Sequence, residues 1–141
     1  GCDGNQARKD GVTPAFTATQ NGQTAALGIL VKAGCDVNQA DEDGRTPAYI
    51  AAQRGLTAAL ELLVKAPGCD VNQADKDGET PAYIAAYKGQ TAAFEFLVKA
   101  PGCDVNQAAQ NGMTPAHTAA LAGHTAALKV LLVEAPGCDV N

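Results

Sequence analysis

One string of residues recurs along the chain at an almost constant distance, and this recurrence restricts the possible folds more than any other feature. The triplet Thr-Pro-Ala begins at Thr13, Thr46, Thr80 and Thr114, in steps of 33, 34 and 34 residues. Cysteine recurs with nearly the same step, at Cys2, Cys35, Cys69, Cys103 and Cys138. A segment of about 34 residues buries too little surface to fold alone. The period therefore predicts a solenoid, in which each unit forms its core together with its neighbours.

The residues around each triplet predict a short helix with a clear beginning and end. In the second unit, Gly44 supplies the positive φ of an Asp-Gly turn like that of a β-hairpin. The hydroxyl of Thr46 is suited to cap a helix, and Pro47 to occupy its first position. Gly55 is suited to end this helix in the left-handed conformation. We therefore expect a turn followed by a helix over residues 48–54.

A second predicted helix follows in each unit and carries the apolar face. Thr57 is expected to cap it, and the apolar residues within 59–64 form a broad face toward the core. Glu61 and Lys65 lie one turn apart on the exposed side, in the favourable acid-first order. Pro67 then ends the helix. Each unit thus consists of a turn, a helix, a second turn, a second helix and a loop.

The core of such units must consist mostly of small side chains. Hydrophobic residues make up 46% of the 141 residues, but aromatic residues only 4%, and tryptophan is absent. Much of the hydrophobic fraction is alanine. We therefore expect closely approaching helix backbones with many small side chains buried between them.

The chain resembles the ankyrin repeat family in three consecutive stretches, DEDGRTPAYIAAQRG, TAALELLVKA and GCDVNQA. Four consecutive units match the family pattern over nearly the whole chain. The tetratricopeptide repeat has the same period, but its aromatic landmarks are missing. The resemblance implies an all-α fold, an ankyrin-repeat solenoid of stacked helix-turn-helix units with β-hairpin-like turns. It implies one array over residues 1–141, with repeats at about 8–40, 41–74, 75–108 and 109–141.

The chain departs from the family pattern in several respects. Alanine replaces the family leucine after Thr-Pro, and the next family residue, histidine, is kept only at His117. At Phe16, Tyr49 and Tyr83 a larger ring stands there, and we expect these rings to fill the core volume that alanine leaves. One additional residue in the last unit, within 128–134, predicts a distortion of that helix or of its exit loop.

Charge and hydropathy favour neither nucleic acid nor a membrane as a partner. The formal net charge of −5 gives a surface that repels phosphate. No stretch reaches the roughly 18 apolar residues of a transmembrane helix. The chain does not open with the basic and apolar regions of a signal peptide. We therefore expect an intracellular, cytoplasmic location.

No pattern of residues indicates catalysis, a cofactor or a metal ion. The five cysteines lack the close pairing of zinc ligands. Equivalent positions in stacked repeats should lie about 10 Å apart, too far for a disulfide, so we expect a ladder of reduced thiols. His117 and His124 fall where the family has histidines that form structural hydrogen bonds. The sequence predicts no catalytic, cofactor-binding or metal-ligating residue.

The resemblance places the binding surface on one side of the array. In the family, hairpin tips and the exposed ends of the first helices line a concave groove. The near-identical units differ most at these positions, as Arg45 and Glu79 show. Exposed aromatic and apolar residues on a polar surface are typical of binding hot spots. We predict that a partner contacts three anchors, Tyr87, Met113 and Leu121, and four surrounding polar residues, Arg45, Arg54, Glu79 and Lys88.

The predicted function is that of a non-catalytic scaffold that binds a protein partner through this groove. We expect no nucleic acid, membrane or small-molecule substrate as a ligand. We expect a monomer, with end-to-end stacking of copies through uncapped terminal repeats as a further mode. Three alternatives stay open: a structural spacer within a longer array, an array that recruits substrate for a larger enzyme, and a redox or metal sensor built from the cysteine ladder.

Overall fold

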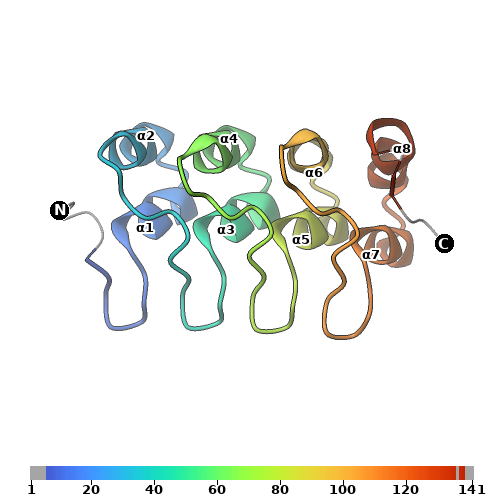
Figure 1. The fold of residues 1–141 in the computed structure, drawn as a ribbon, viewed down its shortest axis with the longest axis horizontal. Helices are drawn as coiled ribbons and strands as arrows, with labels where there is room; N and C mark the ends of the chain where they lie inside the picture. Colours follow the sequence, from blue (N-terminus) through green and yellow to red (C-terminus); the bar gives the residue numbers. More distant parts are fainter. Residues whose placement is uncertain (1–5, 136, 139–141) are drawn as a thin grey trace.

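The computed structural model describes residues 6–135, 137 and 138, and within them the chain forms eight helices and no strand. The helices stand in two rows, with long loops extending from the side of the first row (Figure 1). The first row contains α1 (Pro14–Gln20), α3 (Pro47–Arg54), α5 (Pro81–Lys88) and α7 (Pro115–Ala122). The second row contains α2 (Thr24–Lys32), α4 (Thr57–Lys65), α6 (Thr91–Lys99) and α8 (Thr125–Glu134). The predicted all-α solenoid of helix-turn-helix units is confirmed.

The first helix of each repeat begins where the Thr-Pro pair predicts. In α3, the hydroxyl oxygen of Thr46 accepts a hydrogen bond from the backbone N–H of Tyr49 at 3.1 Å, and Pro47 is the first helical residue. Gly55 ends the helix in the left-handed region, with φ of 69°. The same signals bound α5 and α7. Local sequence therefore determines the limits of the first row of helices.

The second helix of each repeat begins differently from the prediction. Leu56 occupies the N-cap position of α4 and forms no side-chain cap, so the expectation that Thr57 caps this helix is wrong. The N–H of Leu56 donates to the carbonyl of Ala51 at 2.8 Å, and that of Thr57 to the carbonyl of Gly55 at 3.0 Å. This tight connection makes Thr57 the first helical residue.

The additional residue of the last repeat lengthens α8. This helix has 10 residues, whereas α2, α4 and α6 have 9 each, and it is α-helical throughout. Its exit also differs, because φ and ψ of Ala135 are −127° and 71°, while Ala66 and Ala100 are extended. The predicted distortion is therefore confined to an altered exit, and no bulge forms within α8.

The core lies between the two helix rows and contains many small side chains. Leu60 and Phe94 of the second row are fully buried, and Ala85 of the first row has no exposed surface. The rings of Tyr49 and Tyr83 are also buried, as expected from their place after Thr-Pro-Ala. Alanine thus lets the helices approach, and the neighbouring aromatic rings fill the remaining volume.

Backbone hydrogen bonds join neighbouring hairpin loops. The N–H of Lys76 donates to the carbonyl of Asp43 at 3.0 Å, and that of Gln110 to the carbonyl of Asp77 at 2.9 Å. Gly44, with φ of 79°, allows this approach, since a Cβ atom there would lie 3.0 Å from the backbone nitrogen of Lys76. The hairpin loops of repeats two to four therefore form one bonded row.

Asparagine side chains join the repeats at a second place, in the loops that follow the second helices. The amide nitrogen of Asn38 donates to the carbonyl of Gly68 at 2.6 Å, and its amide oxygen accepts from the N–H of Asp70 at 2.8 Å. Asn72 repeats this arrangement with Gly102, at 2.7 Å. The second repeat is thus bonded to the third on both sides of its helices.

The cysteines do not form a uniform ladder of reduced thiols. Cys69 and Cys103 carry free thiols, but Cys35 takes part in a disulfide, so the expectation was wrong there. The spacing argument applies only to thiols at equivalent positions of regularly stacked repeats, such as Cys69 and Cys103. Burial raises the pKa of both of these thiols to about 11, and the carboxylates of Asp70 and Asp104 act in the same direction. Cys2, the first cysteine of the predicted ladder, lies outside the described residues.

Candidate interaction groove

We call the surface between the hairpin loops and the first helices the hairpin groove. Two hollows lie on it. The charged hollow, of about 320 Å³, is lined mainly by ionic side chains, Arg8, Asp10, Asp41, Glu42, Asp43 and Arg45. The mixed hollow, of about 410 Å³, lies between α3, α5, α7 and the loops before α5 and α7. Its walls combine ionic, aromatic and aliphatic side chains.

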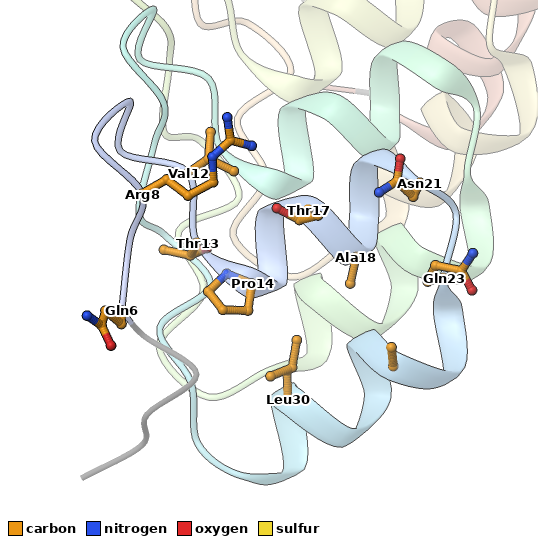
Figure 2. A pocket seen from close by; sticks show the side chains of 11 residues that line it. Gln6, Arg8, Val12, Thr13, Pro14, Thr17, Ala18, Asn21, Gln23 and Leu30 are labelled. Atoms are coloured by element: carbon orange, nitrogen blue, oxygen red, sulfur yellow. The ribbon is translucent and has the colours of Figure 1, made fainter.

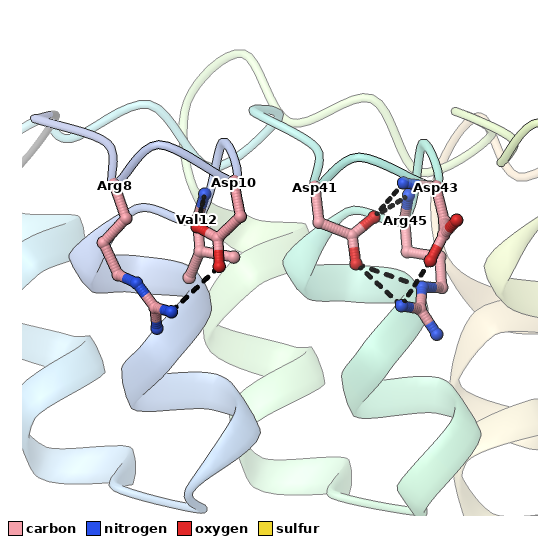
Figure 3. Close-up of polar contacts among 6 residues, drawn as sticks. All are labelled: Arg8, Asp10, Val12, Asp41, Asp43 and Arg45. Atoms are coloured by element: carbon pink, nitrogen blue, oxygen red, sulfur yellow. Dashed lines mark hydrogen bonds and ion pairs between the residues drawn. The ribbon is translucent and has the colours of Figure 1, made fainter.

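Five of the six ionic side chains of the charged hollow are paired within their own hairpin loops (Figure 3). Arg8 lies 2.9 Å from a carboxylate oxygen of Asp10. Arg45 lies 3.0 Å from Asp41 and 2.8 Å from Asp43, and its Nε also donates to Asp41 at 3.1 Å. The positive charge of Arg45 is therefore neutralised by the loop that carries it.

The mixed hollow brings together five of the seven residues that the sequence singles out. Glu79, Tyr87, Lys88, Met113 and Leu121 all line it. The exposed fraction is 73% for Leu121 and 44% for Tyr87, both large for apolar or aromatic side chains. The ammonium nitrogen of Lys88 lies 5.5 Å from the centre of the Tyr87 ring, within the range of a cation–π contact. The predicted anchors thus lie in one continuous surface.

Glu79 connects two repeats across the mixed hollow. The hydroxyl of Tyr49, in α3, donates to the carboxylate of Glu79 at 3.1 Å. Burial raises the pKa of Glu79 above its ordinary value, and the nearby carboxylates of Asp75 and Asp77 raise it further. The hydrogen bond from Tyr49 acts in the opposite direction and favours the ionised form.

The position equivalent to Glu79 in the next repeat carries no charge. Met113 stands where the previous repeat has Glu79, so Tyr83 has no carboxylate opposite it. Within the described residues, the hydroxyl of Tyr83 forms no hydrogen bond. Thr118 lines the same hollow, and its hydroxyl oxygen is buried and has no partner in that part of the chain. The mixed hollow therefore contains polar groups that the fold itself does not satisfy.

Two of the predicted residues, Arg45 and Arg54, lie outside the mixed hollow. Arg45 lies in the charged hollow. The guanidinium of Arg54 donates to the carbonyl of Gln20, at the end of α1, with a distance of 2.6 Å. A cation at this carbonyl end of a helix compensates the helix dipole. Both arginines therefore have contacts within the array itself, which do not require a binding partner.

Sequence reasoning missed four polar residues that line the mixed hollow, Tyr49, Tyr83, Asn111 and Thr118. The rings of Tyr49 and Tyr83 are buried, as predicted, but both residues also line this hollow. Their place between core and groove could have been inferred from the ring position, since a buried tyrosine usually directs its hydroxyl to a polar partner.

A comparison with protein-family models also finds repeats along the whole chain. A family model described as ankyrin repeats, in three copies, matches residues 1–75 and, a second time, residues 57–141. The chain belongs to the ankyrin repeat family. Ankyrin repeats are in general protein–protein interaction modules, and the family is typically non-catalytic. No match was found among curated proteins.

The two histidines of this ankyrin array form hydrogen bonds that hold the fold together. The imidazole Nδ1 of His117 accepts from the N–H of Thr114 at 3.2 Å and completes a capping box at the start of α7. The Nε2 atom of His124 lies 2.9 Å from the carbonyl oxygen of Tyr87 in the previous repeat. Among the described residues, no group of three or more His, Cys, Asp and Glu side chains is arranged to hold a metal ion.

No helix in the described part of the ankyrin array combines the length and the apolar character needed to cross a membrane.

A further hollow, of about 400 Å³, lies at the N-terminal end of the described array (Figure 2). Ala26 lines it and is exposed, whereas its equivalents Ala59, Ala93 and Ala127 are buried by the preceding repeat. Leu30 and Pro14 lie in the same hollow. This surface is therefore a repeat face of the kind that is covered inside the array. End-to-end stacking of copies, and the division into repeats at 8–40, 41–74, 75–108 and 109–141, stay predictions.

Proposed function

We propose that this ankyrin array is a non-catalytic scaffold that binds a protein partner through the mixed hollow. The observation that supports the proposal most is the meeting of Tyr87, Met113 and Leu121, from two repeats, in one hollow with unsatisfied polar groups. Clustered aromatic and apolar side chains surrounded by polar residues are typical of binding hot spots.

The polar surround in this proposal is narrower than the one expected from the sequence. Glu79 and Lys88 line the mixed hollow and flank the anchors. Arg45 and Arg54 have partners within the array, so we assign them to maintaining the groove and not to the principal contact. The proposed partner is a protein, without nucleic acid, membrane or small-molecule substrate.

Affinity capture from an extract of the source cells tests this function. The bait is the array, and the variant is Tyr87→Glu, Met113→Glu, Leu121→Glu, which places carboxylates on the hollow without changing the buried core. A matched control places carboxylates on exposed apolar residues of the second helices, at Ile29, Leu132 and Val133. All three proteins should have the same far-ultraviolet circular dichroism spectrum.

The proposal expects a partner that the array and the control variant retain and the hollow variant loses. A partner retained equally by all three proteins would leave the binding function but show that the mixed hollow is not the site. The absence of any specific partner would instead favour the structural spacer.

A further inference from the structure

The two ends of α5 present opposite charges to the mixed hollow. Glu79 lies two residues before the helix, and Lys88 is its last residue. Only one carboxylate oxygen of Glu79 is engaged, by the hydroxyl of Tyr49. Lys88 contacts the ring of Tyr87 and forms no ion pair within the described residues. Both charges are therefore available to a ligand in the hollow.

The carboxylate end of the hollow carries more negative charge than Glu79 alone would give it. Asp75 and Asp77, in the same hairpin loop, lie near enough to raise the pKa of Glu79. A cation placed among these three carboxylates gains favourable electrostatic energy and also stabilises the ionised form of Glu79. Basic groups of a partner are therefore favoured at this end, and acidic groups at Lys88.

The length of α5 sets the approximate separation of the backbone positions that carry the two charges. An α-helix rises roughly 1.5 Å per residue, so its eight residues span about 12 Å. An extended peptide rises about 3.3 Å per residue, so about four residues cover this distance. Alternate side chains of an extended segment point to the same side. Three side chains of such a segment therefore face the hollow together.

We propose that the mixed hollow recognises an extended protein segment in which a basic and an acidic residue, about four positions apart, flank a bulky apolar residue. The inference rests on the proposed function and specifies the chemistry of its partner. The basic side chain lies at Glu79 and the acidic one at Lys88. The apolar side chain lies between Tyr87, Met113 and Leu121, which line the same hollow.

The free hydroxyl of Tyr83 completes this recognition. An extended segment exposes main-chain carbonyl groups that need hydrogen-bond donors when water is displaced. Because Met113 replaces the carboxylate found one repeat earlier, the Tyr83 hydroxyl has no acceptor within the described residues. It donates to a carbonyl of the bound segment.

Selection from a phage-displayed library of random short peptides tests the inference. The immobilised proteins are the array, its Glu79→Gln variant, its Lys88→Gln variant and the hollow variant with three glutamates. Glu79→Gln conserves side-chain size, Lys88→Gln removes the charge and shortens the side chain, and thermal unfolding confirms that each variant is folded. Peptides selected by the array should carry the basic, apolar and acidic residues at the stated spacing.

The single variants make the assignment of charges specific. On Glu79→Gln the requirement for a basic residue should disappear, while the apolar and acidic requirements remain. On Lys88→Gln the acidic requirement alone should disappear. For a selected peptide, each substitution should weaken binding roughly tenfold, the effect of one charge-assisted contact. Tyr83→Phe should lower the affinity of every selected peptide about fivefold, without changing which residues are preferred in the peptide.

The outcomes separate this inference from the proposed function. Peptides that bind the array, fail on the hollow variant and show no charge pattern would overturn the inference while supporting the function. If no peptide prefers the array over the hollow variant, an extended segment is not the ligand and the inference is wrong. The extract capture still decides the function in that case.

Discussion

Thr118 illustrates how a single residue can act against the stability of the array. Its hydroxyl oxygen is buried without a hydrogen-bond partner in the described residues, while the two preceding repeats have Ile50 and Ile84 at this position. Burying an unpaired hydroxyl is unfavourable because its interactions with water are lost. Thr118 lines the mixed hollow, and a loss of stability of this kind is expected at a site that binds a ligand.

Replacing this hydroxyl should stabilise the protein. Thr118→Val keeps the side-chain shape and removes the unpaired group, so the free energy of unfolding should rise by about 1 kcal/mol. Urea denaturation followed by circular dichroism measures the change. The matched control is Thr19→Val, because the Thr19 hydroxyl donates to the carbonyl of Ala15 at 2.8 Å and its loss should not stabilise. Equal effects of both substitutions would contradict this explanation.

The protonation of Glu79 depends on the contact between two repeats. Its pKa is raised by burial, so the folded state binds a proton more readily than the unfolded state. This contribution to stability is present below the unfolded pKa and is lost as the pH rises through the folded pKa. The Tyr49 hydroxyl limits the effect, because its hydrogen bond favours the carboxylate.

Removing that hydroxyl should raise the pKa of Glu79 further. In Tyr49→Phe, burial and the carboxylates of Asp75 and Asp77 remain while the opposing hydrogen bond is lost. Carbon-13 NMR titration of the Glu79 carboxyl group, in the wild type and the variant, measures the shift. Tyr83→Phe is the control, since that hydroxyl makes no hydrogen bond within the described residues and its removal should leave the titration unchanged. A lower Glu79 pKa in Tyr49→Phe would refute the assigned role.

At the scale of the helices, the first and second rows depend on different interactions at their beginnings. Each first helix has a threonine cap whose oxygen accepts a backbone hydrogen bond, as Thr80 does from the N–H of Tyr83 at 3.1 Å. The second helices have no side-chain cap and start directly after a tight turn. Their stability must come mainly from packing of their apolar faces.

Threonine should therefore matter more before a first helix than at the start of a second one. Thr80→Ala should lower the free energy of unfolding by about 1 kcal/mol, the usual cost of losing a helix cap. Thr91→Ala, at the first position of α6, should cost less, because Thr91 makes only a 3.4 Å hydrogen bond to Gly89. Urea denaturation of both variants compares them directly. A larger loss at Thr91 would show that the caps are not what distinguishes the two rows.

The helices could be predicted from the sequence because their limits depend on neighbouring residues. Thr46, Pro47 and Gly55 act within one turn of the helix they bound, so their roles were recognised without tertiary information. The start of α4 was missed because the preceding turn, and not the threonine, determines it. The mixed hollow was only partly predicted, because the bond from Tyr49 to Glu79 joins residues 30 positions apart.

At the scale of the whole molecule, the array depends on regular contacts between neighbouring repeats. The hairpin loops are bonded through their backbones, and the loops after the second helices are bonded through asparagine side chains. Stability in such a solenoid is the sum of repeat and interface contributions. A change at one interface therefore affects the two repeats that share it.

Gly44 allows this argument to be tested, because it has a counterpart with the same backbone angle but no neighbour. Both Gly44 and Gly68 have φ near 80°, so alanine is strained at either position. Only at Gly44 would the new Cβ atom meet another repeat, 3.0 Å from the nitrogen of Lys76; at Gly68 nothing lies within 4 Å. Gly44→Ala should destabilise the array by at least about 1 kcal/mol more than Gly68→Ala. Equal losses in urea denaturation would mean that the hairpin row tolerates displacement.

The near-identity of the second and third repeats affects how the number of repeats can change during evolution. Because the backbone and asparagine hydrogen bonds between neighbouring repeats recur at the same positions, a repeat that is duplicated or deleted as a whole leaves its neighbours with surfaces that can form these bonds again. Recombination between the two matching stretches of the gene would therefore change the number of repeats without creating a new folding problem. The length of the groove, and with it the number of side chains offered to a partner, can change in one genetic step.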